Sequence, residues 1–468
     1  MLSRLMINTL DFRTLYSRTL QTPEDPSLYL NLCIFYINKD ELELAQRSLI
    51  AAFRVIKEGF DISDFFSSLS EQLTGQFLKT LHDTTRSISS QNDVLGCFFL
   101  IQQIDQLLDQ PSSTSSRFVF FGGYFKNLLG NYNDAKHLLE VDCQFFGHYE
   151  GLSRTLSESL LGSWDLDYNP YSGVDFSILK NFSAFSASAQ SHTSSLIIDR
   201  HHQSLHHNQA IVFLSCDGLY FERLGIVQAL SLIETSPQVG IHFHVMNPQS
   251  TTVYWLNRLQ QDFPKTEISY SLEEVTYGEV GSWERKTFYA SARFCRAASF
   301  CLTTHKPVII TDADQIFRSN IINLIDTSKP SMDYDVALFD YQEAYPFVSL
   351  YAKYGASFVV ISTTELGRKY INQVSFLIHH NLQQKACWTL DQISLLAIAK
   401  LHEKHGTGIK VHKIPIHEIT GKWDGSSATI WNSAGPCKFQ SNTYTKVAKG
   451  LLQKWGFDDI CNSYYADL

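Results

Sequence analysis

Apolar residues near the start of the chain recur at spacings of three and four, and β-branched residues are sparse among them. This period is that of a helix with one apolar face. We therefore predict an α-helical domain at residues 1–165, with a helix start at Asp25-Pro26 and two helices joined by a turn between Leu28 and Ile56. No pattern in this region indicates catalytic chemistry.

Two stretches of the predicted helical domain resemble the helix-turn-helix unit of tetratricopeptide repeats. Leu28 to Ile56 places Ala45 where such a unit packs, and Gly130-Asn131-Tyr132, between Gly123 and Leu139, resembles its turn. Ala45 and Ala135 are not separated by a whole number of the usual repeat lengths. True repeats and a generic helical bundle both remain open. If the repeats are real, their long concave surface predicts a protein partner or an extended acceptor.

A composition rich in Ser, Asn and His then predicts an interdomain linker at residues 166–208. The histidines at 201, 202, 206 and 207 have no neighbouring carboxylate or cysteine, so we interpret them as solvated linker rather than as a metal site.

From Ala210 onward, short apolar strands alternate with amphipathic helices, which is typical of an α/β fold. We assign residues 209–445 to one α/β domain and residues 446–468 to a helical C-terminal tail. The predicted strands are Ala210–Leu214, Gly240–Met246 and Pro307–Thr311, and the predicted helices are Phe221–Ile233, Thr251–Phe263 and Thr287–Leu302.

The composition of the chain excludes some classes of protein. A chain of 468 residues exceeds what one core usually organises, and 44% hydrophobic residues supply ample apolar surface. The net charge of −9, with no basic block, does not suit nucleic-acid binding. Nine cysteines without paired spacing predict free buried thiols in a reducing compartment. Neither a signal peptide nor a membrane-spanning run is recognisable, so we expect a cytoplasmic protein.

The strongest candidate for chemistry is Asp312-Ala313-Asp314, which follows the β-branched strand that ends at Thr311. Ligands of open α/β sheets bind at the carboxyl ends of the strands. Two carboxylates there suit a hard divalent cation such as Mn²⁺ or Mg²⁺, which would neutralise a diphosphate leaving group. A turn in which both aspartates only cap the next segment is the alternative.

The surrounding segments, from about Gln209 to Gln440, resemble the retaining glycosyltransferases of family eight and their relatives on the GT-A fold. The resemblance implies an α/β fold class: a GT-A (Rossmann-like) nucleotide-diphospho-sugar transferase domain, here preceded by an all-α helical domain. The segments that carry it are Cys216-Asp217-Gly218-Leu219-Tyr220, Gln228-Ala229-Leu230-Ser231-Leu232, Phe288 to Arg296, Ala356 to Ser362, Trp388-Thr389-Leu390-Asp391-Gln392 and Asn432 to Lys438.

By this resemblance, Asp217 and Tyr220 would hold the uracil and ribose of a nucleotide, and Arg293 would face the sugar-nucleotide. A carboxylate accepts hydrogen bonds from such groups, and a phenol ring stacks on a base. Helix capping by Asp217 and a solvated helix charge at Arg293 are the alternatives.

The resemblance also implies that Asp391 and Gln392 lie beside the anomeric carbon, where they would bind sugar hydroxyls and stabilise an oxocarbenium-like centre. Asp391 could equally be the N-cap of a helix from Gln392 to Leu401.

The last segment matches the family's His-x-x-Gly-x-x-Lys element, with Asn432 where the family has histidine, followed by Gly435 and Lys438. The resemblance implies that Asp312, Asp314 and Asn432 hold the metal, and that Asp312, Gly435 and Lys438 contact the donor. An asparagine oxygen suits a hard cation. His412 and His417 are reserve candidates for the missing ligand.

These features predict a metal-dependent hexosyltransferase that uses a nucleotide-sugar donor, a UDP-hexose, and a hydroxyl acceptor on a glycan or protein, with retention. One alternative is a helical interaction protein with a catalytically inactive transferase-like domain. A nucleotidyltransferase is disfavoured, because no Gly-rich, basic phosphate loop follows the first strand.

Overall fold

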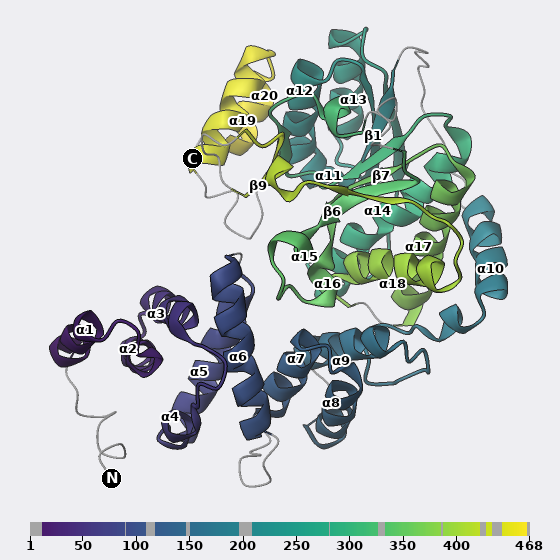
Figure 1. The fold of residues 1–468 in the computed structure, drawn as a ribbon. Coiled ribbons are helices and arrows are strands. Elements are labelled where there is room, and N and C mark those ends of the chain that lie inside the picture. Colours follow the sequence, from purple (N-terminus) through teal and green to yellow (C-terminus); the bar gives the residue numbers. More distant parts are fainter. Residues whose placement is uncertain are drawn as a thin grey trace. The chain divides into compact units, whose positions relative to one another are not determined.

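The computed structural model describes residues 12–88, 90–108, 118–146, 150–195, 208–279, 281–325, 333–384, 387–421, 427–432 and 442–465. The chain folds into two compact units, drawn in Figure 1. The first, here the helical unit, comprises Met1–Asp175 and Tyr341–Lys353, and the second, the α/β unit, comprises Phe176–Asp340 and Tyr354–Leu468. The domain boundaries that we drew from the sequence stay a prediction.

The described part of the helical unit consists of helices joined by short turns (Figure 1). Neighbouring helices along the chain pack against each other, notably α2 on α3, α7 on α8 and α8 on α9. The helices are α1 (Phe12–Gln21), α2 (Pro26–Asn38), α3 (Leu42–Val55), α4 (Ser63–Ser67), α5 (Glu71–Thr85), α6 (Gln91–Leu108), α7 (Val119–Leu128), α8 (Tyr132–Phe146), α9 (Glu150–Ser163), α15 (Tyr341–Ala344) and α16 (Leu350–Lys353).

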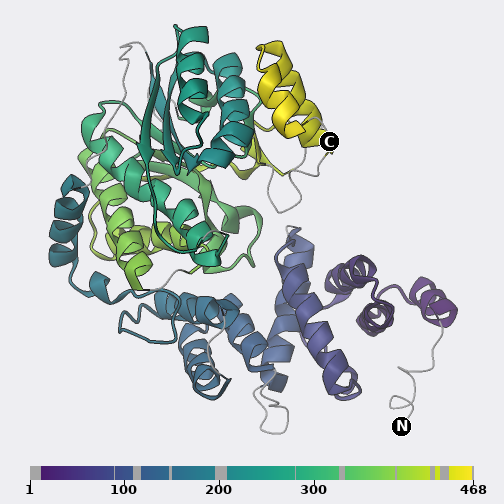
Figure 2. The same ribbon diagram turned by 180° about the vertical axis from the view of Figure 1, so that it is seen from behind.

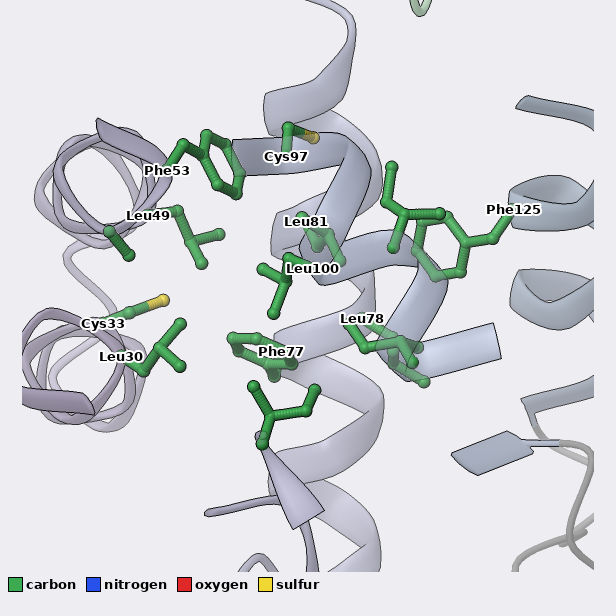
Figure 3. Packing of buried hydrophobic residues seen from close by; sticks show 14 of the residues in the cluster. Leu30, Cys33, Leu49, Phe53, Phe77, Leu78, Leu81, Cys97, Leu100 and Phe125 are labelled. Carbon is green, nitrogen blue, oxygen red and sulfur yellow. The ribbon is translucent and has the colours of Figure 1, made fainter. Parts of the chain in front are cut away.

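The core of the helical unit is a cluster of fully buried aliphatic and aromatic side chains from several helices (Figure 3). Each large apolar side chain that is removed from water contributes about 1.5–3 kcal/mol, which is the main source of stability for helices of this length. Members labelled in Figure 3 include Leu30 and Cys33 on α2, Leu49 and Phe53 on α3, Phe77, Leu78 and Leu81 on α5, Cys97 and Leu100 on α6, and Phe125 on α7.

Local sequence signals correctly gave the start of α2 and the turn between α7 and α8. The carboxylate of Asp25 accepts a hydrogen bond from the Ser27 N–H at 2.9 Å, with Pro26 opening α2, so the predicted helix start is confirmed. Gly130 has a φ of +81° between α7 and α8, a conformation that glycine adopts without strain. The two helix-turn-helix pairs exist as predicted, whereas the repeat interpretation stays a prediction.

The segment Tyr341–Lys353 belongs to the helical unit, although strands of the α/β unit flank it in the sequence. Phe347 joins the apolar cluster, and the Tyr351 N–H donates to the Glu158 carboxylate on α9 at 3.3 Å. Glu158 is buried, and this burial raises the pKa of its carboxyl to about 7. Nothing in the sequence pattern predicted this return of the chain.

The α/β unit is built on a seven-stranded sheet with the order β3-β2-β1-β4-β7-β6-β8. Strands β1 to β4 are mutually parallel where they pair, and β7 is antiparallel to both β4 and β6. The strands are β1 (Ala210–Asp217), β2 (Val239–Met246), β3 (Ile268–Glu273), β4 (Val308–Thr311), β6 (Val336–Asp340), β7 (Tyr354–Ile361) and β8 (Val411–Ile414). A smaller sheet, in the order β5-β10-β9, contains β5 (Gln315–Phe317), β9 (Ile419–Thr420) and β10 (Ile430–Asn432).

Helices cover both faces of the large sheet, as Figures 1 and 2 show from opposite sides. On β1, Phe213 packs against Phe300 of α14, whereas the next residue, Leu214, faces Gly225 just before α12. Since neighbouring strand residues point to opposite faces, α14 and α12 lie on opposite sides of the sheet. The helical segments are η2 (Ser177–Lys180), α10 (Phe182–Ser195), α11 (Gly218–Tyr220), η3 (Phe221–Gly225), α12 (Ile226–Thr235), α13 (Thr252–Asp262), α14 (Trp283–Thr303), η4 (Ile321–Leu324), α17 (Glu365–Gln384), α18 (Leu390–Lys404), η6 (Ile416–Glu418), α19 (Asn442–Lys454) and α20 (Asp458–Tyr465).

The predicted fold class is confirmed: a mixed α/β unit on one large, partly parallel sheet follows an all-α unit. The strands and helices predicted from Ala210 onward are present, although the turn η3 has π-helical hydrogen bonding where we expected a regular helix.

Part of the predicted linker is a helix, which is a correction. Phe185 and Ala189, four residues apart on α10, are buried, and Ser186 accepts a hydrogen bond from Gln373 of α17 at 2.8 Å. Packing of this face on α17 overrides the low helix propensity of the serines. The histidines at 201, 202, 206 and 207 lie outside the described residues.

Two expectations from composition can be checked in the described residues. The eight described cysteines are all free and buried, as predicted for thiols in a reducing compartment. None of the described helices combines the length and the apolar character that crossing a membrane requires.

Candidate active site

The sheet order reverses between β1 and β4, because β2 and β3 lie on one side of β1 while β4 lies on the other. Such a switch point is where open α/β sheets bind ligands, at the carboxyl ends of the strands. Asp217 ends β1 and Asp312 follows β4 directly. The fold therefore brings two predicted site residues to this edge.

Asp312 is held at the edge by its backbone. Its N–H donates to the Ser357 carbonyl of β7 at 3.1 Å, and the side-chain amide of Gln315 donates to the same carbonyl at 2.9 Å. The carboxylate of Asp312 keeps 30% exposure, whereas β4 itself is fully buried. A partly exposed carboxylate that directly follows a buried strand is available to a ligand.

Arg293 on α14 joins Asp312 to Asp391, and we call these three residues the Arg293 cluster. The guanidinium donates through Nη1 to Asp312, and through Nη2 to Asp391 at 2.9 Å and to the Ala356 carbonyl at 3.0 Å. Only 7% of the arginine side chain is exposed. The alternative of a solvated helix charge is therefore wrong.

Asp391 is buried at the start of α18, which begins at Leu390 rather than at Gln392. Thr389 occupies the N-cap position, so the N-cap alternative for Asp391 is wrong by two residues, although the Gln392 N–H does donate to its carboxylate at 2.9 Å. Burial raises the pKa of Asp391, and the guanidinium of Arg293 opposes this rise. Gln392 is half-buried beside it.

Asn432 lies near Asp314 because β10 pairs with β5. The antiparallel register sets Asn432 opposite Gln315, the residue after Asp314. The side-chain oxygen of Asn432 is buried and has no hydrogen-bond partner in the described part of the chain. A buried polar atom without a partner is costly, so this oxygen suits a ligand that supplies positive charge.

The donors near this edge fit a hard cation. Asp312, Asp314 and Asn432 offer carboxylate and amide oxygens, the ligands that Mg²⁺ and Mn²⁺ take. Among the described residues there is no group of three or more His, Cys, Asp or Glu that could hold a metal. His412 lies on β8 and stacks on Tyr334, and His417 is exposed beside Glu418.

Asp217 and Tyr220 lie at the end of β1. The Asp217 carboxylate accepts from the Tyr220 N–H at 2.8 Å, so the capping alternative is confirmed. Burial raises the pKa of Asp217, and the backbone hydrogen bond from Tyr220 opposes this rise. A Cβ added at Gly218 would come within 2.7 Å of the Asn247 carbonyl, which explains the glycine in this turn. A nucleotide role for Asp217 and Tyr220 stays a prediction.

Sequence reasoning missed Asn247, which follows β2 at the same edge. Its side chain donates to the Tyr289 hydroxyl at 2.8 Å and accepts from the Val275 N–H at 2.7 Å. It thereby ties the ends of β2 and β3 to α14. A polar residue directly after a buried strand, the signal used for Asp217 and Asp312, could have found it. Gly435 and Lys438 lie outside the described residues.

No protein-family model and no curated protein matches the chain. Among solved structures, the chain is similar to the glycosyltransferase GlyE of Streptococcus pneumoniae, with 11% identity and a TM-score of 0.35. It is also similar to the bifunctional glycosyltransferase WbbM, with 13% identity and a TM-score of 0.38, and to the galactosyltransferase LgtC, with 14% identity and a TM-score of 0.36.

These matches cover about half of this chain: 54% for GlyE, 53% for WbbM and 55% for LgtC. They cover 64% of GlyE, 50% of WbbM and 96% of LgtC, so the chain spans less than two thirds of the first two. With TM-scores below 0.5 and identities below 25%, these likenesses carry no argument about what this chain does. The proposed function rests on the residues of the site.

Proposed function

We propose that the α/β unit is a metal-dependent glycosyltransferase. It moves a sugar from a nucleotide-sugar donor, a UDP-hexose, to a hydroxyl group of a glycan or protein, with retention at the anomeric carbon. The residues proposed to act are Asp312, Asp314 and Asn432 toward the metal, Asp217, Tyr220, Arg293, Gly435 and Lys438 toward the donor, and Asp391 with Gln392 at the reacting sugar.

The observation that carries this proposal is the Arg293 cluster. Arg293, Asp312 and Asp391 come from three separate sequence motifs that the family resemblance assigned to one donor site. Hydrogen bonds from one guanidinium to both carboxylates support that assignment, because Asp391 is 98 positions from Arg293 in the sequence. If the motif matches were due to chance, their residues would have no reason to lie together in the folded chain.

The charges of the cluster suit a divalent cation. The carboxylates of Asp312, Asp314 and Asp391 outnumber the guanidinium, to which Asp314 also contributes an attractive charge. An excess of negative charge would repel a diphosphate that arrives alone. A bound Mn²⁺ or Mg²⁺ would neutralise the charge that develops on the leaving diphosphate.

The chain's own residues would position and stabilise the reacting sugar. Arg293 fixes the carboxylates of Asp312 and Asp391, and its charge opposes the rise that burial causes in the pKa of Asp391. Asp391 is buried, so its negative charge would act strongly on an oxocarbenium-like centre that forms beside it. A front-face route, in which the leaving diphosphate takes the acceptor proton, needs no enzyme nucleophile and depends on such positioning.

The test is release of UDP from a panel of UDP-sugars with Mn²⁺, comparing the full chain with an Asp312→Ala/Asp314→Ala variant. We expect metal-dependent release from one donor and a fall of about 100-fold or more in the variant. Asp333→Ala is the matched control, because this aspartate keeps 72% exposure and pairs with Lys410 at the surface. Its release rate should equal that of the wild type.

If the wild-type chain neither releases UDP nor binds it in a metal-dependent way by calorimetry, the transferase proposal fails. The helical interaction protein with an inactive transferase-like domain would then be the better description.

A further inference from the structure

Two tryptophans meet near the Arg293 cluster. Trp283 is the first residue of α14, and Trp388 lies in the turn before α18. Their ring centroids are 5.4 Å apart and their planes make an angle of 70°. Trp283 is 59% exposed and Trp388 is half-buried, so the pair forms an open aromatic corner.

The position of this corner follows from the two helices. The last turn of α14 leads into β4, so its first turn lies on the ligand side of the sheet. Trp283 precedes Arg293 by ten positions, which corresponds to about 15 Å along a helix axis. Trp388 precedes Asp391 by three positions. The pair therefore lies beyond the proposed transfer site, on the ligand side of the sheet.

The turn that carries Trp388 has an unusual backbone conformation. Thr389 has a φ of +69°, a left-handed conformation that a β-branched residue rarely adopts. The turn is held by a hydrogen bond from the Leu390 N–H to the Cys387 carbonyl at 3.1 Å, and by one from the Thr389 hydroxyl to the Trp388 carbonyl. Strain of this kind persists where the surrounding structure fixes a residue for function.

The chemistry of the corner suits a sugar ring. A pyranose presents C–H bonds on one face and hydroxyl groups around its rim, and an indole is a flat apolar surface with one N–H donor. The ammonium group of Lys286 lies 5.1 Å from the Trp283 ring centroid, where it could donate to hydroxyl groups. A peptide would instead use an open strand edge or a helix groove, and the corner consists of a helix start and a turn.

We propose that Trp283 and Trp388 bind the acceptor saccharide, a few sugar units from the hydroxyl group that receives the transferred sugar. This inference rests on the proposed function, which it deepens by making a glycan the acceptor. Binding here needs neither donor nor metal, so it is measured separately from transfer.

The experiment is a titration of tryptophan fluorescence in the metal-free full chain. The probes are α-glucan, β-glucan, β-galactan and chitin oligosaccharides of one to four units, with a mixed-sequence soluble peptide as a further probe. We expect a tetrasaccharide of one series to bind, the monosaccharide to bind weakly, and Trp283→Ala or Trp388→Ala to lose about tenfold in affinity. Calorimetry with the same saccharide replaces fluorescence for the variants that lack a tryptophan.

Two controls separate stacking from folding. Trp283→Phe and Trp388→Phe keep a flat ring and should restore most of the affinity. Tyr254→Ala removes an aromatic ring of similar exposure, 57%, from α13 on the other side of the sheet, and should bind as the wild type does. Thermal unfolding of each variant checks that the fold is intact.

The proposal is overturned if no saccharide of the panel binds to the wild type, if the alanine variants bind as well as the wild type, or if only the peptide binding depends on the tryptophans. Saccharide binding by a chain that neither releases UDP nor binds it in a metal-dependent way would instead leave this subsite standing and remove the transferase function.

Discussion

The two units of the chain bury charge in different ways. In the α/β unit, Arg293 is surrounded by the carboxylates of Asp312 and Asp391, so each buried charge faces an opposite one. In the helical unit, Glu158 accepts hydrogen bonds from neutral donors, among them the Tyr351 N–H, and the charge of Arg154 offsets its burial only in part. Burial therefore raises the pKa of Glu158 to about 7.

This difference separates two uses of a buried carboxyl group. The guanidinium of Arg293 opposes the rise that burial causes in the pKa of Asp391, which favours the charged form that a ligand could use. A carboxyl group among neutral donors takes up a proton near neutral pH and makes folding depend on pH. The first arrangement belongs to the candidate active site, and the second fixes the segment Tyr341–Lys353 in the helical unit.

Arg293→Ala should have the largest effect, because it leaves the buried carboxylate of Asp391 without its counter-charge. We expect a loss of about 3–5 kcal/mol in the free energy of unfolding, together with loss of UDP release. Urea unfolding and the UDP-sugar assay measure the two effects. Arg293→Lys keeps the charge but not the forked geometry of the guanidinium. It should therefore restore more of the stability than of the UDP release. Equal stability of Arg293→Ala and the wild type would contradict a stabilising role of Arg293 between Asp312 and Asp391.

Asp312→Asn should mainly affect activity. Asp312 is half-exposed and Arg293 keeps its bond to Asp391, so stability should fall by less than it does in Arg293→Ala. Release of UDP should fall by about 100-fold, since the carboxylate charge is lost at the proposed metal site. Rates measured over a range of Mn²⁺ concentrations check this. An unchanged rate of UDP release would show that Asp312 has no role in the proposed metal site.

Glu158→Gln should change the pH dependence of stability. The native pKa of about 7 exceeds the ordinary value of 4.5, so the native state binds this proton more tightly than the unfolded chain does. The wild type should therefore lose stability as the pH rises from about 5 to 8, by on the order of 2 kcal/mol relative to Glu158→Gln. Unfolding curves of both chains across this range give the difference. Parallel curves would show that Glu158 does not titrate there.

Asp217 variants should have the smallest effect. Asp217→Ala removes the cap on the Tyr220 N–H and should cost about 1 kcal/mol of stability. Asparagine also caps helices, so Asp217→Asn should fold as the wild type does. If the carboxylate binds the nucleotide, the KM for the donor rises in Asp217→Asn although stability is unchanged. Identical kinetics would leave Asp217 with the capping role alone.

Much of the candidate site could be predicted from the sequence, because its elements follow local rules. The β-branched residues before Asp312 form a buried strand, and a carboxylate after such a strand lies at the ligand edge of the sheet. Asp25 and Asp217 cap helices as their residue type and position suggest. The helix α10 within the predicted linker was missed, because it is stabilised by packing on α17, which a local pattern does not contain.

The sequence by itself determined which residues form strands and helices and which polar residues end them, since these depend on periodicity and on hydrogen bonds between near neighbours. Only the tertiary structure decided that Arg293 joins Asp312 to Asp391, that Asn432 lies opposite Gln315, and that Tyr341–Lys353 packs with the helical unit. Each of these contacts joins residues far apart in the chain, and the whole fold has to form before either partner has a position.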